Sequence, residues 1–307
     1  MRFWILLGVG SALLAGPAQG PIVSQLQEKS CPKGKGAEQF GPAMSPGDSG
    51  KVYSSVLSPD GKEFYFFKLV GPGHEDYRIF RSRLSSGYWS SSELLDLGGD
   101  YSDLYPAPSP DGKRLVFASY RPAPGDTSGH RNAHLWYVVR SGKEWVEPRF
   151  IHASTYGYYH SGLRHDADGS LRFNRTTPDW QSTQQFSIRW TDTAYSSAEK
   201  VPPDPAAEYW REHLGDSMYV WGAVGGPDGI ALVQVSRVAA NGRRSPAVYF
   251  LSRLQGNEWS DLVPAGGGLG EGAPNFAWFS RDSCYVHYTS DYTSFRRVPL
   301  AEVLEGR

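Results

Sequence analysis

The chain has 307 residues, enough for one large or two ordinary domains, and its formal net charge is −1. This balance argues against an extended nucleic-acid-binding surface, which would need an excess of basic residues. Aromatic residues make up 14% of the chain, which also contains 35 glycines and 22 prolines. This composition favours short strands joined by tight turns over helices.

The N-terminus has the features of an export signal. Arg2 is followed by an apolar run over 3–14 and by small residues up to Gly20. This order is typical of a secretory signal peptide, and the run is shorter than the ~20 residues of a transmembrane helix. We therefore expect a signal peptide at 1–20, a leader at 21–50 and one domain at 51–307. We also expect no membrane span, and a periplasmic or extracellular location.

A five-residue phrase recurs along the rest of the chain. Ser58-Pro59-Asp60-Gly61-Lys62 is repeated unchanged at 109–113, and weaker copies lie at 166–170, 226–230 and 280–284. Regular spacing of roughly 50 to 60 residues indicates a repeat architecture. Proline presets φ, aspartate hydrogen-bonds the turn backbone and glycine takes positive φ, so each copy predicts a hairpin turn.

A second phrase keeps step with the first. It is a glycine followed by a tryptophan, at Gly87-Tyr88-Trp89, Gly142-Lys143-Glu144-Trp145 and Gly256-Asn257-Glu258-Trp259. Each unit thus contains four short antiparallel strands, which is the unit of a β-propeller. We expect an all-β fold with five blades. Six blades are the alternative, with 21–50 or 190–217 supplying the extra one.

The second unit carries a family resemblance. Its segment Tyr105-Pro106-Ala107-Pro108, followed by the turn phrase and by Arg114-Leu115-Val116-Phe117-Ala118-Ser119, resembles the WD40-like (PD40) repeat of TolB-type propellers. The match is close in the first two units and weak in the others. The resemblance implies a periplasmic or secreted propeller, often a protein-binding platform, and it names no catalytic residue.

The last unit lacks a strand. No glycine–tryptophan phrase follows its third strand at 294–298, and residues 300–304 have a helical pattern. An open blade would expose unpaired backbone, so we expect the leader to supply the missing strand. Cys31 in the leader and Cys284 in the last blade then form a disulfide in an exported protein, or else remain two separate thiols.

Functional groups are expected on the face that carries the long, varied connections between strands. Loop carboxylates outside the turn phrase are candidate catalytic groups: Asp76, Asp103, Asp216 and Glu271. Aromatic, histidine and arginine side chains outside the repeated positions are candidate binding groups: His134, Tyr159, His160, Arg164, Trp180 and Trp210. The alternative for these aromatics is that they anchor loops in small cores. The histidine spacing fits no common metal site, so no metal or cofactor is expected.

Two functions are compatible with this pattern. The first is a monomeric, exported binding or scaffold propeller for an envelope protein, or for a glycan, without catalytic activity. The second is a five-bladed glycoside hydrolase-like enzyme, which needs a pair of carboxylates ~5 to ~9.5 Å apart at the mouth of the channel. Convergence of acidic side chains from different blades would favour the enzyme.

Overall fold

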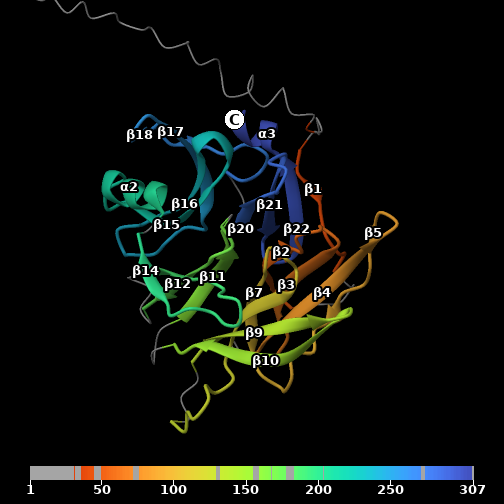
Figure 1. The fold of residues 1–307 in the computed structure, drawn as a ribbon. Coiled ribbons are helices and arrows are strands. Elements are labelled where there is room, and N and C mark those ends of the chain that lie inside the picture. Colours follow the sequence, from red (N-terminus) through yellow and green to blue (C-terminus); the bar gives the residue numbers. More distant parts are fainter. Residues whose placement is uncertain are drawn as a thin grey trace, which may run out of the picture.

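Five antiparallel sheets surround a common centre in the computed structural model (Figure 1). The structure describes residues 31, 36–44, 50–71, 76–128, 132–154, 159–166, 168–177, 183–202, 204–270 and 274–305. The predicted five-bladed β-propeller is confirmed. The described residues of 190–217 form a short strand and a helix rather than a sixth blade.

Each blade runs from an innermost strand at the centre to an outermost strand at the rim. Blade 1 contains β2 (Val52–Leu57), β3 (Glu63–Leu69) and β4 (Tyr77–Ser85), with β5 (Tyr88–Trp89) and β6 (Glu93–Leu94) sharing the outermost position. Blade 2 contains β7 (Asp103–Pro108), β8 (Arg114–Ser119), β9 (His134–Ser141) and β10 (Glu144–His152). Blade 3 contains β11 (Tyr159–His165), β12 (Leu171–Thr176), β13 (Thr183–Ile188) and β14 (Glu199–Val201). Blade 4 contains β15 (Met218–Gly225), β16 (Ile230–Arg237) and β17 (Val248–Gln255), with β18 (Glu258–Trp259) and β19 (Val263–Pro264) outermost. Blade 5 contains β20 (Pro274–Phe279), β21 (Tyr285–Ser290), β22 (Ser294–Pro299) and β1 (Glu38–Gln39).

In the part of the chain that the structure describes, the helical pieces are α2 (Pro205–His213), the 3₁₀ turn η1 (Pro227–Gly229) and α3 (Leu300–Leu304). The α2 helix lies beside β15 (Figure 1) and begins at Asp204, whose carboxylate accepts hydrogen bonds from the backbone N–H groups of Ala206 and Ala207. Among the described residues, no helix is long and apolar enough to cross a membrane.

The turn phrase folds through its own side chains. In blade 1 the Ser58 hydroxyl donates to the Asp60 carboxylate (2.6 Å), which accepts from the Lys62 N–H (3.1 Å). The Glu63 N–H donates to the Ser58 hydroxyl (2.8 Å), and Gly61 takes a φ of 70°. The same bonds recur in blade 2 and, in large part, in blade 5. Asp60, Asp111 and Asp282 are therefore structural turn caps.

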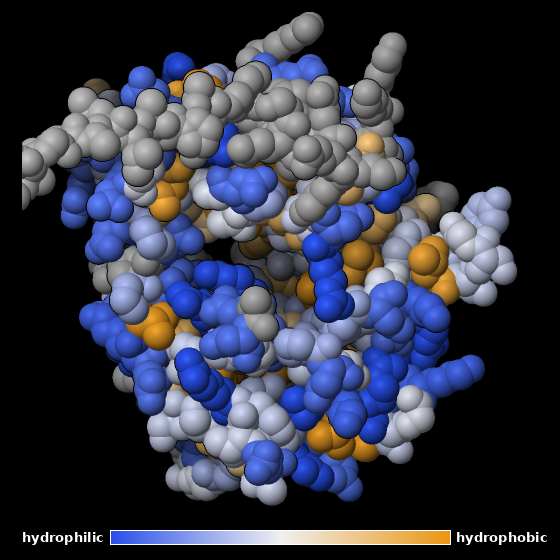
Figure 2. Space-filling model, turned by 45° about the horizontal axis from the view of Figure 1, so that its top comes forward, coloured by the Kyte–Doolittle hydropathy of each residue, from blue (hydrophilic) through white to orange (hydrophobic). Residues whose placement is uncertain are grey.

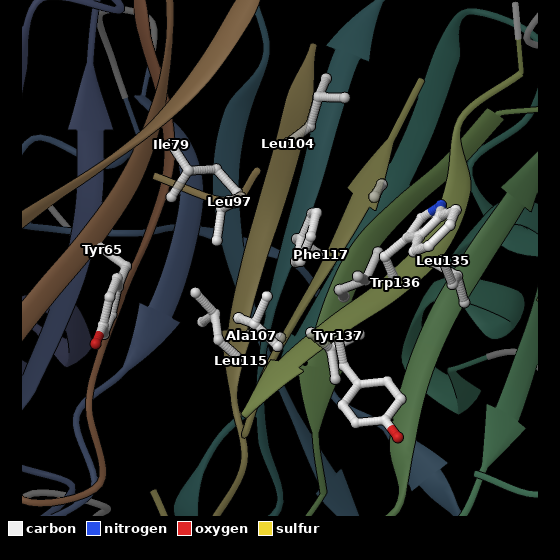
Figure 3. Packing of buried hydrophobic residues seen from close by; sticks show 14 of the residues in the cluster. Tyr65, Ile79, Leu97, Leu104, Ala107, Leu115, Phe117, Leu135, Trp136 and Tyr137 are labelled. Carbon is white, nitrogen blue, oxygen red and sulfur yellow. The ribbon is translucent and has the colours of Figure 1, made fainter. Parts of the chain in front are cut away.

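The largest apolar cluster fills the interfaces between blades 1, 2 and 3. Strand β8 supplies Leu115 and Phe117, both without solvent exposure, and β9 supplies Leu135 and Tyr137 beside them (Figure 3). Tyr65 of β3 approaches Trp145 of β10, with their ring centroids 6.4 Å apart. The consecutive apolar residues Leu115 to Ala118 of β8 are all buried, so both faces of the blade 2 sheet pack against neighbours.

The N-terminal segment completes blade 5. Strand β1 pairs with β22, with Glu38 opposite Arg297. Phe40 follows β1, and its ring packs 5.8 Å from the ring of Phe64 in blade 1. A disulfide bond joins Cys31 to Cys284, whose Cα atoms are 5.3 Å apart, within the ~7 Å that such a bond allows.

Candidate functional site

The propeller has a turn face and a loop face. The turn face carries the tight turns between first and second strands, such as 58–62 and 109–113. The loop face carries the connections between second and third strands, among them 120–133 and 238–247, and those between blades. Each innermost strand therefore begins at the loop face.

A one-residue β-bulge interrupts the innermost strand of every blade. In each case the strand register shifts by one residue against the second strand. The first residues of the bulges are Tyr53, Tyr105, Gly162, Trp221 and Phe276. A bulge bends the strand and redirects a side chain, and bulges are enriched next to functional sites.

We call Tyr53, Tyr105, Trp221 and Phe276 the bulge aromatics. Tyr105 and Phe276 have φ values of 52° and 53°, in the left-handed region that bulky side chains rarely adopt. Backbone of this kind costs of the order of 1–3 kcal/mol and clusters at ligand sites. The strain therefore points to a role for these side chains beyond packing.

The bulge aromatics keep solvent access although they lie on the innermost strands. Trp221 is 41% exposed, and the other three are partly exposed. Their chain neighbours Val52, Leu104 and Val220 are buried. Tyr53, Tyr105 and Phe276 come together from blades 1, 2 and 5, because Tyr53 interacts with Tyr105 and its ring lies 6.1 Å from that of Phe276. Trp221 stands on the innermost strand of blade 4, and Figure 2 shows that the surface is hollowed near its middle.

Five tyrosines from three blades gather at the loop face. We call them the tyrosine cluster: Tyr53, Tyr77, Tyr105, Tyr120 and Tyr292. The Tyr53 ring stacks on Phe67 (5.1 Å between centroids) and lies 5.5 Å from the Tyr77 ring and 5.2 Å from the Tyr292 ring. Phe276 of blade 5 lies 6.1 Å from Tyr53.

Three members of the tyrosine cluster have a raised pKa. Burial, together with the neighbouring Tyr77, raises the pKa of Tyr53 to about 12. Burial also raises the pKa of Tyr105 and of Tyr292. These hydroxyls stay protonated, so each of them can donate and accept hydrogen bonds.

The candidate carboxylate Asp103 is buried in an ion pair. Asp103 is 5% exposed and Arg121 is 4% exposed, and the guanidinium lies 3.4 Å from both carboxylate oxygens. Arg121 also donates to the backbone oxygen of Leu97 (3.0 Å) and to the Ser119 hydroxyl (2.9 Å). Burial raises the pKa of Asp103 to about 6, against the opposing effect of Arg121. This pair ties the start of β7 to the connection that follows β8.

The other candidate acids lie apart from this pair. Asp76 forms an ion pair with Arg78, which also contacts Asp100. Asp216 is exposed in the connection between α2 and β15, in blade 4. Glu271 lies outside the described residues. Asp76 and Asp103 belong to adjacent blades, and the charge of Arg78 acts on both carboxylates.

The structure brings two of the candidate binding residues together. His134 and His160 are buried near the loop-face ends of blades 2 and 3, and the His160 ring lies 5.7 Å from that of His152. Burial lowers the pKa of all three, that of His160 to about 3, so the group is neutral at pH 7. Among the described residues, no three His, Cys, Asp or Glu side chains are placed to hold a metal ion.

The remaining candidates are dispersed. Tyr159 begins β11 beside His160, whereas Arg164 is exposed near the turn-face end of that strand. Trp210 is 7% exposed and packs α2 against blade 4, which is the loop-anchoring role left open above. Trp180 lies outside the described residues.

The sequence analysis missed the bulge aromatics, although a signal for them exists. Each precedes the turn aspartate of its blade by the same number of residues, to within one residue. Aligning the units on that aspartate places an aromatic residue at or next to this position in the first, second, fourth and fifth units, and Gly162 in the third. The strand register is needed to see that the position is a bulge.

Comparison with known proteins adds architecture alone. No family model and no curated protein matches the chain. Solved structures with a similar fold include a candidate TolB of Agrobacterium tumefaciens, with 16% identity, a TM-score of 0.43 and coverage of 77% of this chain and 74% of that one. The periplasmic gluconolactonase of Pseudomonas aeruginosa has 16% identity and a TM-score of 0.41, with 77% and 64% covered. An endo-arabinase of Bacteroides thetaiotaomicron has 10% identity and a TM-score of 0.43, with 85% and 96% covered.

Proposed function

We propose that this protein is exported and acts as a binding protein, holding an envelope protein or glycan on its loop face at the mouth of the central space. The observation that carries the proposal is the set of bulge aromatics on the innermost strands, among which Tyr105 and Phe276 have strained backbone and Trp221 is 41% exposed. Rigid strands present these rings, so little conformational entropy is lost when a ligand binds.

Two features support export. The sequence begins with the pattern of a secretory signal peptide. A disulfide joins the leader to the last blade, and such bonds persist mainly in oxidising compartments.

One observation favours the alternative of a carbohydrate-active enzyme. A pKa of about 6 for Asp103 lies in the range of a general acid near neutral pH. Against this role, Asp103 is buried and its carboxylate faces Arg121, where a substrate has little access. The ion pair gives Asp103 a structural task that explains its position.

The test compares capture with catalysis. The mature chain and its Trp221→Ala variant are used to capture partners from an envelope extract, with Tyr88→Ala as the control because Tyr88 is 80% exposed at the rim. We expect capture to fall with Trp221→Ala and to persist with Tyr88→Ala. In parallel, chromogenic glycosides are assayed with the mature chain and with Asp103→Asn. Turnover that the Asp103→Asn variant abolishes while it stays folded would establish the enzyme instead.

A further inference from the structure

We infer that the ligand of the loop face is a neutral glycan, held by stacking on the bulge aromatics and by hydrogen bonds to the tyrosine cluster. This inference rests on the proposed function and names the chemical class of its ligand. It draws on three features of the site: exposed ring faces, uncharged hydroxyls and interrupted strand edges.

Trp221 offers a fixed aromatic face. Its indole N–H donates to the Ser236 hydroxyl (2.8 Å), and the Tyr219 ring meets it edge-on with centroids 4.9 Å apart. The Arg244 guanidinium lies 3.6 Å from the Tyr219 centroid and 5.2 Å from that of Trp221. These contacts hold the indole in place, while 41% of the residue remains exposed. A sugar ring has one apolar C–H face that can cover such a surface, and its hydroxyls lie within reach of the arginine.

The tyrosine cluster supplies matching polar groups. Sugar hydroxyls both donate and accept hydrogen bonds, as protonated tyrosine hydroxyls do. Tyr53, Tyr105 and Tyr292 come from blades 1, 2 and 5 and lie near one another. Several weak, well-placed bonds of this kind fix the orientation of a polar ligand.

The charges nearest these rings already interact with the protein, and that of Arg244 lies over the Tyr219 ring. Asp103 is paired with Arg121, and Asp76 with Arg78. Lys51 lies over the Tyr292 ring at 5.9 Å from its centroid. Burying a charged ligand group without an opposite charge is costly, so this site favours an uncharged ligand.

The bulges also disfavour a peptide strand. A peptide that adds to a sheet needs a regular edge of N–H and C=O groups. Every innermost strand is interrupted by a bulge near its middle, and bulges are a means of blocking edge pairing. A glycan has no such requirement because its bonds are made by hydroxyls.

The experiment uses the mature chain, with the disulfide intact, and neutral oligosaccharides of four to six units from cellulose, starch, arabinan, galactan and chitin. Binding is measured by calorimetry and by tryptophan fluorescence. We expect at least one oligosaccharide series to bind, and Trp221→Ala to raise its Kd at least about tenfold. Tyr105→Phe keeps the ring and should raise the Kd about two- to tenfold through the lost hydroxyl. Tyr88→Ala is the control and should leave the Kd unchanged, and circular dichroism verifies that each variant is folded.

The outcomes separate this inference from the proposed function. If no oligosaccharide binds, or if binding is insensitive to both Trp221→Ala and Tyr105→Phe, the glycan inference is wrong. If an envelope protein is nevertheless captured through Trp221, the proposed binding function stands without it. If capture is also insensitive to Trp221→Ala, both fail. If oligosaccharides bind and are cleaved, the glycan inference holds and the non-catalytic function does not.

Discussion

Phe117 tests the packing between the blades because its side chain carries no competing polar role. It lies on β8 without solvent exposure, opposite the bulge that contains Tyr105. Its ring centroid is 5.2 Å from the Arg121 guanidinium. The change to test is Phe117→Ala, which empties this position while leaving the backbone hydrogen bonds of β8 in place.

The expected loss follows from the complete burial of the ring. Removing a fully buried phenylalanine side chain forfeits about 1.5–3 kcal/mol of transfer free energy. A residual cavity of roughly 100 Å³ adds about 2 kcal/mol at ~24 cal/mol per Å³. Phe117→Ala should therefore lower the free energy of unfolding by ~3–5 kcal/mol.

Urea unfolding of the oxidised protein, followed by circular dichroism, measures this loss. The m-value should stay constant, so that the shift in midpoint reports stability. Tyr88→Ala, at an exposed rim position, should change the free energy of unfolding by no more than about 0.5 kcal/mol. A loss below about 1 kcal/mol for Phe117→Ala would show that this face of β8 is not packed, and the inter-blade core described above would be wrong.

Three further predictions concern the disulfide, a histidine and the buried ion pair. Reducing the Cys31–Cys284 bond, which spans 253 residues, should lower the free energy of unfolding by at most roughly 5 kcal/mol; an unchanged urea midpoint in reductant would contradict this. The pKa of His160 in the folded chain is lowered to about 3, so as pH falls the histidine is protonated in the unfolded chain before it is protonated in the folded chain. The stability that the neutral, buried His160 contributes is therefore present above pH 6.5 and is lost as pH falls toward 3. His160→Gln should flatten the dependence of the urea midpoint on pH in that window, by up to about 1.4 kcal/mol per pH unit; an unaltered slope would refute the assignment. Asp103→Ala should cost about 3–5 kcal/mol by leaving the Arg121 charge buried alone, and adding Arg121→Met should recover most of it; equal losses in the single and double variants would argue against the pair.

The number of blades could be predicted because the repeated signal is local. Ser58, Asp60 and Gly61 build their turn through bonds that span at most five residues, so the turn forms wherever that phrase occurs. Apolar residues on either side then define paired strands. The same reasoning anticipates a strand from the leader, since a propeller blade without a fourth strand leaves β22 with an open edge.

The candidate site could not be predicted, because it depends on contacts between residues that are far apart in the sequence. In the sequence, Asp103 and Arg121 are two polar residues near loops, and Asp103 could be a catalytic acid. The structure shows that both side chains are buried and that they form an ion pair. His134 and His160 come from different blades, so their proximity follows from how blades 2 and 3 pack.

The sequence by itself determined the repeat, the turns and the order of strands, because each depends on neighbouring residues. The tertiary structure alone decided which aromatic side chains turn toward the centre. A bulge shifts the strand register by one residue. Because side chains alternate between the two faces of a strand, a shift of one residue moves the following side chains to the opposite face. Tyr105 therefore interacts with Tyr53 and Tyr292 of blades 1 and 5, while Phe117 opposite its bulge is buried between blades.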